Sequence, residues 1–359
     1  MFFKDIYQYL RTFQQRITRR MQMSYILENY IHPLIVSLSV KHVYGPRRIK
    51  YNIDELLVLC LLRDGELYIT SFIHHYFSLG VKHIVFLDNG STDDTIKIAR
   101  QHENVTILRT KIPYRKYETF MKKYLVKRFS RNRWNLFSDI DELFDYPYSD
   151  KLGLKSFLNY LNANSYTAVL AHMLDMFSEV PLGLLKSDKS DDLKKTYTFY
   201  DISNLRRERY PSGYGDSKEN INWHIGGVRK TLFNTDNYLT KAALILYKQK
   251  MRIFVNCHQV EFASIADVTT VLLHYPFTSL FYKKVADAVE TDRYASSASQ
   301  EYEMYWKRLQ EDKNLPIKQE NACQLTRVDE LIERDFLVIS ESYVQWVKQY
   351  GKAAKSINY

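Results

Sequence analysis

The segment that decides the fold is Trp134-Asn135-Leu136-Phe137-Ser138-Asp139-Ile140-Asp141-Glu142. Its first half is apolar enough to form a buried strand, and two aspartates separated by one residue follow directly. In an extended chain, side chains two residues apart lie about 7 Å apart on the same face, so both carboxylates would share one side while Ile140 turns into the core. Two adjacent carboxylates favour a cation beside them. The segment therefore predicts a strand that ends in an anionic site.

Three segments before this one also combine a short apolar run with a following helix. Strands are predicted over residues 56–62, 83–87, 105–108 and 134–138, and helices over residues 67–77, 95–101 and 117–129. Gly80 ends the first helix, because glycine readily adopts the left-handed conformation at a helix terminus. Strands and helices alternate at the spacing of βαβ units, which predicts an α/β fold with a doubly wound, mostly parallel sheet flanked by helices.

Acidic residues follow three of these strands at the point where each strand ends. They are Asp64, Asp88 and the pair Asp139 and Asp141. In a parallel sheet the carboxyl ends of the strands meet at one edge, and the ligands of doubly wound proteins bind there. These carboxylates are therefore expected to converge, although 24 residues or more separate them along the chain.

The remainder of the chain has weaker patterns. A helix is predicted near residues 154–161, strands are predicted near residues 167–170, 227–233, 252–255 and 268–273, and a helical tail is predicted from Pro276 onward. No internal repeat, low-complexity tract or clear linker divides the sequence.

The composition restricts the class of protein. The 359 residues include 45% hydrophobic and 26% charged side chains with only 11 glycines and 8 prolines, which excludes collagen-like, low-complexity and wholly disordered chains. Cys60, Cys257 and Cys323 have no paired spacing, so we expect a reducing compartment and neither a zinc site nor a disulfide framework. We expect no signal peptide and no membrane-spanning helix, because charged and polar residues interrupt the apolar stretches.

The formal charge of +10 is concentrated in two segments. Residues 109–133 contain ten basic side chains against Glu118, a net charge of +9, and residues 1–23 contain five against Asp5, a net charge of +4. Subtracting 9 and 4 from 10 leaves −3 for the rest of the chain. Residues 1–30 also have the apolar periodicity of a helix. Residues 109–133 favour an anionic acceptor, a phosphate-bearing substrate or a membrane surface, and the alternative is a solvated helix face. Residues 1–30 are typical of peripheral membrane contact, or of a helix packed on its own domain or on a partner protein.

Taken together, the spaced segments resemble family 2 glycosyltransferases, and most closely the branch related to family 92. The matching segments are Leu57-Val58-Leu59-Cys60 with Arg63 and Glu66, Leu79-Gly80-Val81-Lys82-His83-Ile84, Asp88-Asn89-Gly90-Ser91-Thr92-Asp93, and Trp134 with Ser138-Asp139-Ile140-Asp141-Glu142-Leu143-Phe144. The resemblance covers residues 54–146 and extends to His274-Tyr275, which is similar to a His-Tyr pair near the end of the catalytic domain in that branch.

The resemblance implies a GT-A fold that transfers a sugar, with inversion, from a nucleoside diphosphate donor to a hydroxyl group. By position, Asp139, Asp141 and His274 would hold Mn²⁺ or Mg²⁺. The donor, with a UDP-sugar favoured, would contact Arg63, Asp64, Asp88, Asn89, Asp93 and Asp139. The chain departs from the family at Arg63-Asp64-Gly65-Glu66, where the family commonly has Asn-Glu after the basic residue, and this bears on the nucleotide contacts of the loop.

Inversion also requires a carboxylate that accepts the proton of the acceptor hydroxyl. Asp175, shortly after the predicted strand at 167–170, is the first choice for this general base, and Glu179 and Asp216 are the next. For each of them the alternative is an ordinary carboxylate in a surface loop.

The same resemblance divides the chain into three parts. They are a basic helical extension over residues 1–50, a catalytic domain over residues 51–280 and a helical extension over residues 281–359. The expected acceptor is a glycan or a lipid-linked molecule in the synthesis of a cell-surface polysaccharide or glycoconjugate. The expected location is the cytoplasm, with peripheral membrane contact through residues 1–30 and 109–133.

Two other functions stay open at this level. Paired carboxylates with a metal also serve nucleotidyl and phosphoryl transferases, although the sequence has no glycine-rich loop of the Walker type. A non-catalytic protein could instead bind nucleic acid through the basic segment 109–133, but nucleic acid is the disfavoured partner.

Overall fold

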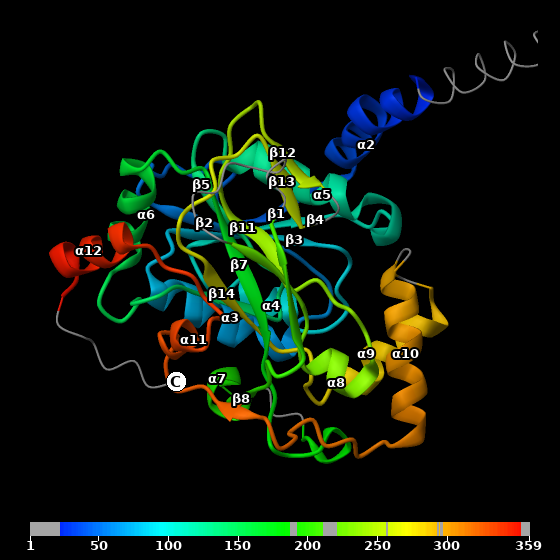
Figure 1. The fold of residues 1–359 in the computed structure, drawn as a ribbon. Coiled ribbons are helices and arrows are strands. Elements are labelled where there is room, and N and C mark those ends of the chain that lie inside the picture. The colour runs from blue at the N-terminus through cyan, green and yellow to red at the C-terminus, as the bar shows by residue number, and fades with distance from the viewer. Residues whose placement is uncertain are drawn as a thin grey trace, which may run out of the picture.

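A large central sheet organises the molecule (Figure 1). The structure is a computed structural model that describes residues 22–186, 192–210, 221–255, 258–292, 294 and 297–352. Within these residues, nine strands form the sheet in the order β1 (Lys41–Tyr44), β4 (Val105–Arg109), β3 (His83–Asp88), β2 (Leu56–Leu62), β5 (Trp134–Phe137), β11 (Thr240–Leu246), β7 (Ala168–Asp175), β14 (Thr270–His274) and β6 (Glu142–Asp145).

Most of these strands point the same way. Strands β4, β3, β2 and β5 are parallel neighbours, and β7 is parallel to β14. Because β11 is antiparallel to both β5 and β7, these two strands run in one direction. Strands β1, β11 and β6 run in the opposite direction. The predicted α/β fold with a mostly parallel sheet is confirmed, and the sheet is consistent with the GT-A type.

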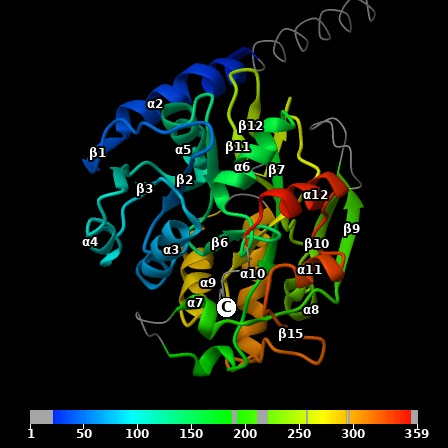
Figure 2. The ribbon, with the colours of Figure 1, turned by 90° about the vertical axis from the view of Figure 1, so that its left-hand side faces the viewer.

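Alternate side chains of the central strand pack on opposite faces of the sheet. All seven residues of β2 are buried. Val58 and Cys60 belong to the core shared with helices α3 (Glu66–Leu79), α4 (Thr95–Ala99) and α6 (Leu154–Ala163). Leu59 and Leu61 belong to a second core shared with α5 (Tyr114–Phe129) and α2 (His32–Ser39), which lies along α5 (Figure 2). The continuous apolar run in the sequence reflects this burial on both faces.

The remaining elements surround the central sheet. They are η1 (Leu27–Ile31), η2 (Leu182–Leu184), α7 (Leu193–Thr196), α8 (Val228–Phe233), α9 (Phe281–Glu290), α10 (Ser297–Glu311), α11 (Glu330–Glu333), α12 (Glu341–Tyr350), and the strand pairs β9 (Leu205–Arg209) with β10 (Asn222–Gly226), β12 (Arg252–Val255) with β13 (Gln259–Glu261), and β8 (Phe199–Tyr200) with β15 (Cys323–Gln324). No helix in the part of the chain that the structure describes is long and apolar enough to cross a membrane. The predicted helical character of the tail after Pro276 is confirmed.

The structure corrects the sequence prediction in several places. The predicted strand at 227–233 is wrong: residues Val228–Phe233 form helix α8, because Gly226 and Gly227 have φ angles of 99° and 67° that turn the chain sharply after β10. The sequence analysis also missed β11, whose seven residues are all buried although Lys241 interrupts its apolar run. The predicted short strand at 167–170 extends to Asp175 as β7.

A buried tyrosine fixes the connection between β5 and β6. The hydroxyl of Tyr76 lies 2.7 Å from Ser138 Oγ and 3.0 Å from the carbonyl oxygen of Glu142, and it accepts a hydrogen bond from the Phe144 N–H at 3.0 Å. Tyr76 is fully buried on α3. It therefore ties the residues on both sides of Asp139-Ile140-Asp141 to one rigid helix.

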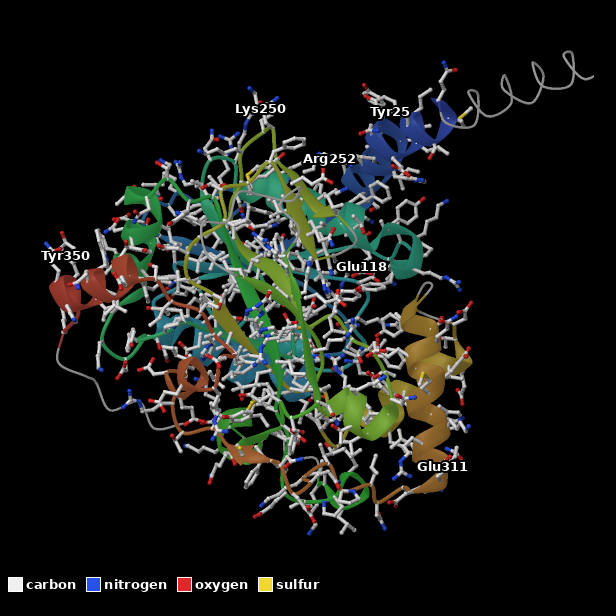
Figure 3. The ribbon with its side chains drawn as sticks, in the orientation of Figure 1. Tyr25, Glu118, Lys250, Arg252, Glu311 and Tyr350 are labelled. Carbon is white, nitrogen blue, oxygen red and sulfur yellow. The ribbon has the colours of Figure 1, made fainter. Side chains whose placement is uncertain are left out.

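Tyr76→Phe is expected to lower the free energy of unfolding by about 1–3 kcal/mol, because the buried Phe144 N–H loses its acceptor. Urea denaturation measures this change. Tyr350→Phe is the matched control, since Tyr350 is 46% exposed at the end of α12 (Figure 3), and a surface change there should stay within about 0.5 kcal/mol. Equal effects in the two variants would contradict this account.

Candidate functional site

The topology gathers the polar residues of seven strands at one edge of the sheet. Strands β2, β3, β5, β7 and β14 end at this edge, and the reversed strands β11 and β6 begin there. The residues at this carboxyl edge are Asp64, Asp88, Asp139, Asp141, Glu142, Asp175, Lys241 and His274. His274 pairs in register with Asp175 on one side and with Glu142 on the other. The predicted convergence of Asp64, Asp88 and the Asp139–Asp141 pair on one edge follows from this arrangement.

The two aspartates of the decisive segment lie in a turn. The Glu142 N–H donates a hydrogen bond to the carbonyl oxygen of Asp139 at 3.0 Å, and the chain reverses here from β5 into β6. The expectation of an extended segment with alternating side chains is therefore wrong, although Ile140 does pack against the core. Ile140 is half-buried against Gly65, where even a methyl group on the glycine would lie 2.9 Å from Ile140 Cγ1.

Lys241 lies beneath this turn. Its Nζ is 2.6 Å from each carboxylate oxygen of Glu142 and 3.3 Å from Asp139 Oδ2. The Asp139 N–H donates to Glu142 Oε2 at 2.9 Å, so Glu142 connects the lysine to the turn. Burial would raise the pKa of Asp139, but the ammonium groups of Lys241 and Lys122 outweigh it and hold that pKa below its usual value. Asp139 is therefore an anion with a cation beside it.

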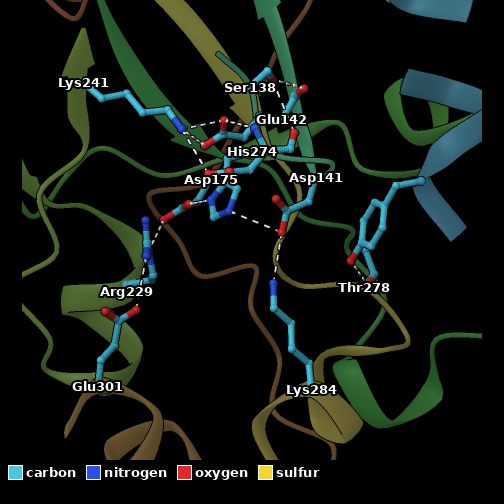
Figure 4. A network of polar contacts seen from close by, with 12 residues as sticks. Ser138, Asp141, Glu142, Asp175, Arg229, Lys241, His274, Thr278, Lys284 and Glu301 are labelled. Carbon is cyan, nitrogen blue, oxygen red and sulfur yellow. Dashed lines mark hydrogen bonds and ion pairs between the residues drawn. The ribbon is translucent and has the colours of Figure 1, made fainter. Parts of the chain in front are cut away.

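Asp141 faces two cationic groups (Figure 4). Its Oδ2 atom is 3.1 Å from Lys284 Nζ, and the same oxygen is 3.7 Å from His274 Nε2. Burial opposes ionisation of Asp141, but Lys284 and His274 hold its pKa well below the usual range. The Tyr275 N–H fixes the backbone by donating to the Asp141 carbonyl oxygen at 2.8 Å.

Asp175 lies on the other side of the same histidine. Its Oδ1 atom accepts a hydrogen bond from His274 Nδ1 at 2.6 Å, and its Oδ2 atom accepts one from Arg229 Nε at 2.7 Å. Burial would lower the pKa of His274, but Asp141 and Asp175 raise it to about 9. Arg229 also lies 3.4 Å from Glu301 on α10. Both oxygens of Asp175 thus have partners, and its side chain is only 3% exposed.

The residues expected to contact the donor nucleotide divide into two groups. Asp88 and Asp93 hold the loop together: Asp88 Oδ1 accepts from the Ser91 N–H at 2.7 Å, and Asp93 Oδ2 accepts from the Glu66 N–H at 3.0 Å. Asn89 is buried and donates to the carbonyl oxygen of Ile112 at 3.0 Å. These three side chains shape the rim mainly through contacts within the protein.

Arg63 and Asp64 lie at the exposed part of this rim. Their side chains are 43% and 37% exposed and form an ion pair at 3.2 Å. Asp64 also accepts from the Thr92 N–H at 2.7 Å, and its own N–H donates to Ser91 Oγ at 2.9 Å. Asp64 has a positive φ of 53°, which a tight turn before α3 imposes. This pair is available to a ligand at the carboxyl edge.

The other two residues expected as general base stand apart from the network. Glu179 is 66% exposed and pairs with Lys318 at 3.2 Å. Asp216 lies outside the described residues. Of the three residues expected as general base, only Asp175 is placed by the described part of the structure at the carboxyl edge, with Asp139 and Asp141.

Sequence reasoning missed the cations of this site. The sequence does indicate that Lys241 is unusual, because it is a single lysine that interrupts the apolar run of β11. Arg229 lies in the segment 227–233, for which the sequence predicts a strand and indicates no acidic partner. Lys284 lies in an ordinary amphipathic helix, 143 residues from Asp141, and nothing in the sequence indicates that the two meet.

The side chains expected to hold a metal have suitable donor atoms in an unsuitable arrangement. Carboxylate oxygens and imidazole nitrogen are ligands of Mn²⁺, and Mg²⁺ prefers oxygen. Among the residues that the structure describes, however, no group of three or more His, Cys, Asp or Glu side chains is placed to hold a metal ion. Lys241 and Lys284 face the oxygens that a metal would use. As arranged, Asp139, Asp141 and His274 do not fit such a centre.

Comparisons with known proteins give little further guidance. No protein-family model matches the chain, and no curated protein matches it in sequence. Among solved structures the chain is similar to glucosyl-3-phosphoglycerate synthase from Mycobacterium tuberculosis in complex with Mn²⁺, UDP and glucosyl-3-phosphoglycerate, with a TM-score of 0.24 and 18% identity over 36% of this chain and 50% of that chain. The match spans only half of that structure, and similarity this low assigns neither family nor activity to the chain.

Proposed function

We propose that the chain is a GT-A glycosyltransferase, similar to family 2 and to the branch related to family 92, that transfers a sugar from a nucleoside diphosphate donor to a hydroxyl acceptor with inversion. The observation that supports this proposal is the position of the Asp139–Glu142 turn at the carboxyl edge, beside the ends of the strands that deliver Asp64 and Asp88. Doubly wound proteins bind nucleotides at this edge.

The carboxyl edge has partly exposed groups for both parts of such a donor: carboxylates for its hydroxyl groups and an ammonium group for its diphosphate. The partly exposed carboxylates are Asp64 and Asp139, at 37% and 38%, and carboxylates accept hydrogen bonds from ribose and sugar hydroxyls. Lys284 is 37% exposed and carries the ammonium charge that favours a diphosphate. We assign the hydroxyl-bearing parts of the donor to the first pair and its diphosphate to the lysine. A UDP-sugar is the proposed donor.

The reaction breaks the bond between the sugar and the diphosphate and leaves negative charge on the departing diphosphate. The acceptor hydroxyl forms the new bond from the opposite face and loses its proton to a base. Asp175, Glu179 and Asp216 stay predictions for that base. Because both oxygens of Asp175 already have partners, we favour Asp175 as the residue that positions His274 and Arg229.

A divalent metal would supply positive charge to the departing diphosphate when bound. Mn²⁺ or Mg²⁺ stays a prediction of the resemblance, and no step above depends on it, because the described side chains do not fit a metal centre.

Asp64→Ala and Asp139→Ala are each expected to weaken the binding of UDP-sugar by about 10- to 100-fold, since a hydrogen bond to a charged group contributes about 1.5–3 kcal/mol. Calorimetric titration with a panel of nucleotide sugars measures this loss. Glu311→Ala removes a 55% exposed carboxylate at the end of α10, outside the edge, and is the control, expected to bind like the wild type. Failure of every nucleotide sugar to bind the wild type would refute the proposed function.

We also propose that the enzyme contacts an anionic membrane on its cytoplasmic face, where it would act on a glycan or lipid-linked acceptor for a cell-surface polysaccharide or glycoconjugate. Tyr30, Leu34 and Leu38 are 63%, 58% and 76% exposed and follow one another at four-residue spacing along η1 and α2. The same helical segment carries Tyr25, which points away from the core (Figure 3). Residues 1–21, where the other basic segment lies, are outside the described residues.

The neighbouring helix α5 carries exposed lysines. His32 of α2 packs on Tyr117 and Phe120 of α5, with ring centroids 5.4 and 4.9 Å apart. Lys116 and Lys127 of α5 are exposed. Exposed apolar side chains on α2, together with exposed lysines on the helix packed against it, support the proposed contact with an anionic membrane.

Leu34→Ser together with Leu38→Ser is expected to reduce binding to phosphatidylserine-containing vesicles by tenfold or more, because two apolar side chains no longer enter the interface. Vesicle sedimentation measures the bound fraction. Leu184→Ser, at a similarly exposed leucine on η2, should leave binding unchanged. Equal binding of the double variant and the wild type would contradict the membrane proposal.

A further inference from the structure

A lysine occupies the position at Asp141 where the resemblance implies a metal ion. Lys284 Nζ is 3.1 Å from Asp141 Oδ2, and His274 Nε2 approaches the same oxygen from another side at 3.7 Å. Asp141 is 8% exposed, whereas Lys284 is 37% exposed. The oxygen is therefore shared between a buried ring and an ammonium group that can be reached from solvent.

The fold fixes the rotation of the helix that carries this lysine. Phe281, Val285 and Ala288 lie on one face of α9 and are buried. Phe281 and Val285 belong to the apolar cluster that also contains Tyr305 of α10. Lys284 lies on a neighbouring face that points toward the turn of Asp141. Its placement follows from core packing and needs no ligand.

The segment after α9 is also attached to the edge. Asp292, just beyond the helix, forms an ion pair with Arg115 in the first turn of α5. Nearby, the ring of Tyr294 packs edge-on against Tyr114 with centroids 6.1 Å apart. These contacts hold the C-terminal end of α9 next to the β4–α5 side of the site. The helix that carries Lys284 is thus held in place both along its apolar face and beyond its C-terminal end.

A divalent ion on Asp141 would face a direct electrostatic conflict. An ion at Asp141 Oδ2 would share this oxygen with an ammonium group whose nitrogen lies 3.1 Å from it, and two positive charges beside one oxygen repel each other. Lys241 presents the same conflict at Asp139, with its Nζ 3.3 Å from Asp139 Oδ2. Binding of a metal ion at Asp141 Oδ2 would therefore require Lys284 to move away from this oxygen.

We propose that Lys284 takes the place of the divalent cation, so that the enzyme binds the diphosphate of its donor and transfers the sugar without a metal. This inference rests on the proposed function. Lys284 is partly exposed and can donate hydrogen bonds to a diphosphate oxygen while Asp141 holds it in position. When the bond between the sugar carbon and the diphosphate oxygen breaks, its electron pair stays on that oxygen, next to the ammonium. The acceptor oxygen forms the new bond, and its proton passes to a carboxylate base.

The test is calorimetric titration of UDP into the full-length protein after treatment with EDTA, and again with added Mn²⁺. For the wild type we expect the two dissociation constants to agree within twofold. Lys284→Met keeps the length of the side chain but removes its charge, and it should weaken metal-free UDP binding by at least tenfold. Lys283→Met removes the adjacent, exposed lysine of α9 and should bind UDP like the wild type.

The lysine variant provides a second readout. Without the ammonium, Asp141 becomes available to a cation, so Mn²⁺ should strengthen UDP binding to Lys284→Met and not to the wild type. Lys284→Gln repeats the test with a polar side chain if the methionine variant does not fold. The inference is overturned if EDTA abolishes UDP binding to the wild type, or if the folded lysine variants bind metal-free UDP as tightly as the wild type. Absence of binding by all proteins, with and without Mn²⁺, would instead refute the proposed function itself.

Discussion

Around strands β5, β6, β7 and β14, the carboxyl edge of the central sheet must keep three carboxylates out of water, and the surrounding structure supplies a cation for each. Asp141, Glu142 and Asp175 are buried, and their partners are Lys284, Lys241 and Arg229. A buried carboxylate without such a partner would cost several kcal/mol. The pairing therefore dictates which elements must meet at this edge and in which orientation.

The two sides of each pair come from different parts of the chain. The carboxylates follow or begin the strands β5, β6 and β7, whereas the cations come from β11, α8 and α9, later in the sequence. Strand β11 lies between β5 and β7 and runs against both, which brings its first residues, including Lys241, to the edge where the parallel strands end. The antiparallel direction of β11 therefore places Lys241 next to the Asp139–Glu142 turn.

Much of this edge could be predicted from the sequence, because it depends on short segments of neighbouring residues. Strands β2, β3 and β5 are short apolar runs, and the acidic residues that follow them had to share an edge once the strands were parallel. The cations could not be predicted, because their partners are distant: Lys241 meets Glu142 across 99 residues and Lys284 meets Asp141 across 143. The predicted strand at 227–233 failed because the positive φ angles of Gly226 and Gly227 turn the chain, and this depends on tertiary structure. The aspartate pair predicts a cation beside it, and the resemblance implies a metal ion, whereas the sequence does not indicate that lysines lie there.

The central claim is that this edge binds the diphosphate of a nucleotide donor. A crystal structure of the protein grown with UDP in the absence of divalent metal tests it most directly. We predict UDP at the carboxyl edge, with a diphosphate oxygen within hydrogen-bonding distance of Lys284 Nζ and the ribose on the side of Asp64. UDP bound elsewhere, for example on the basic face of α5, or a diphosphate that makes no contact with Lys284, would contradict the claim.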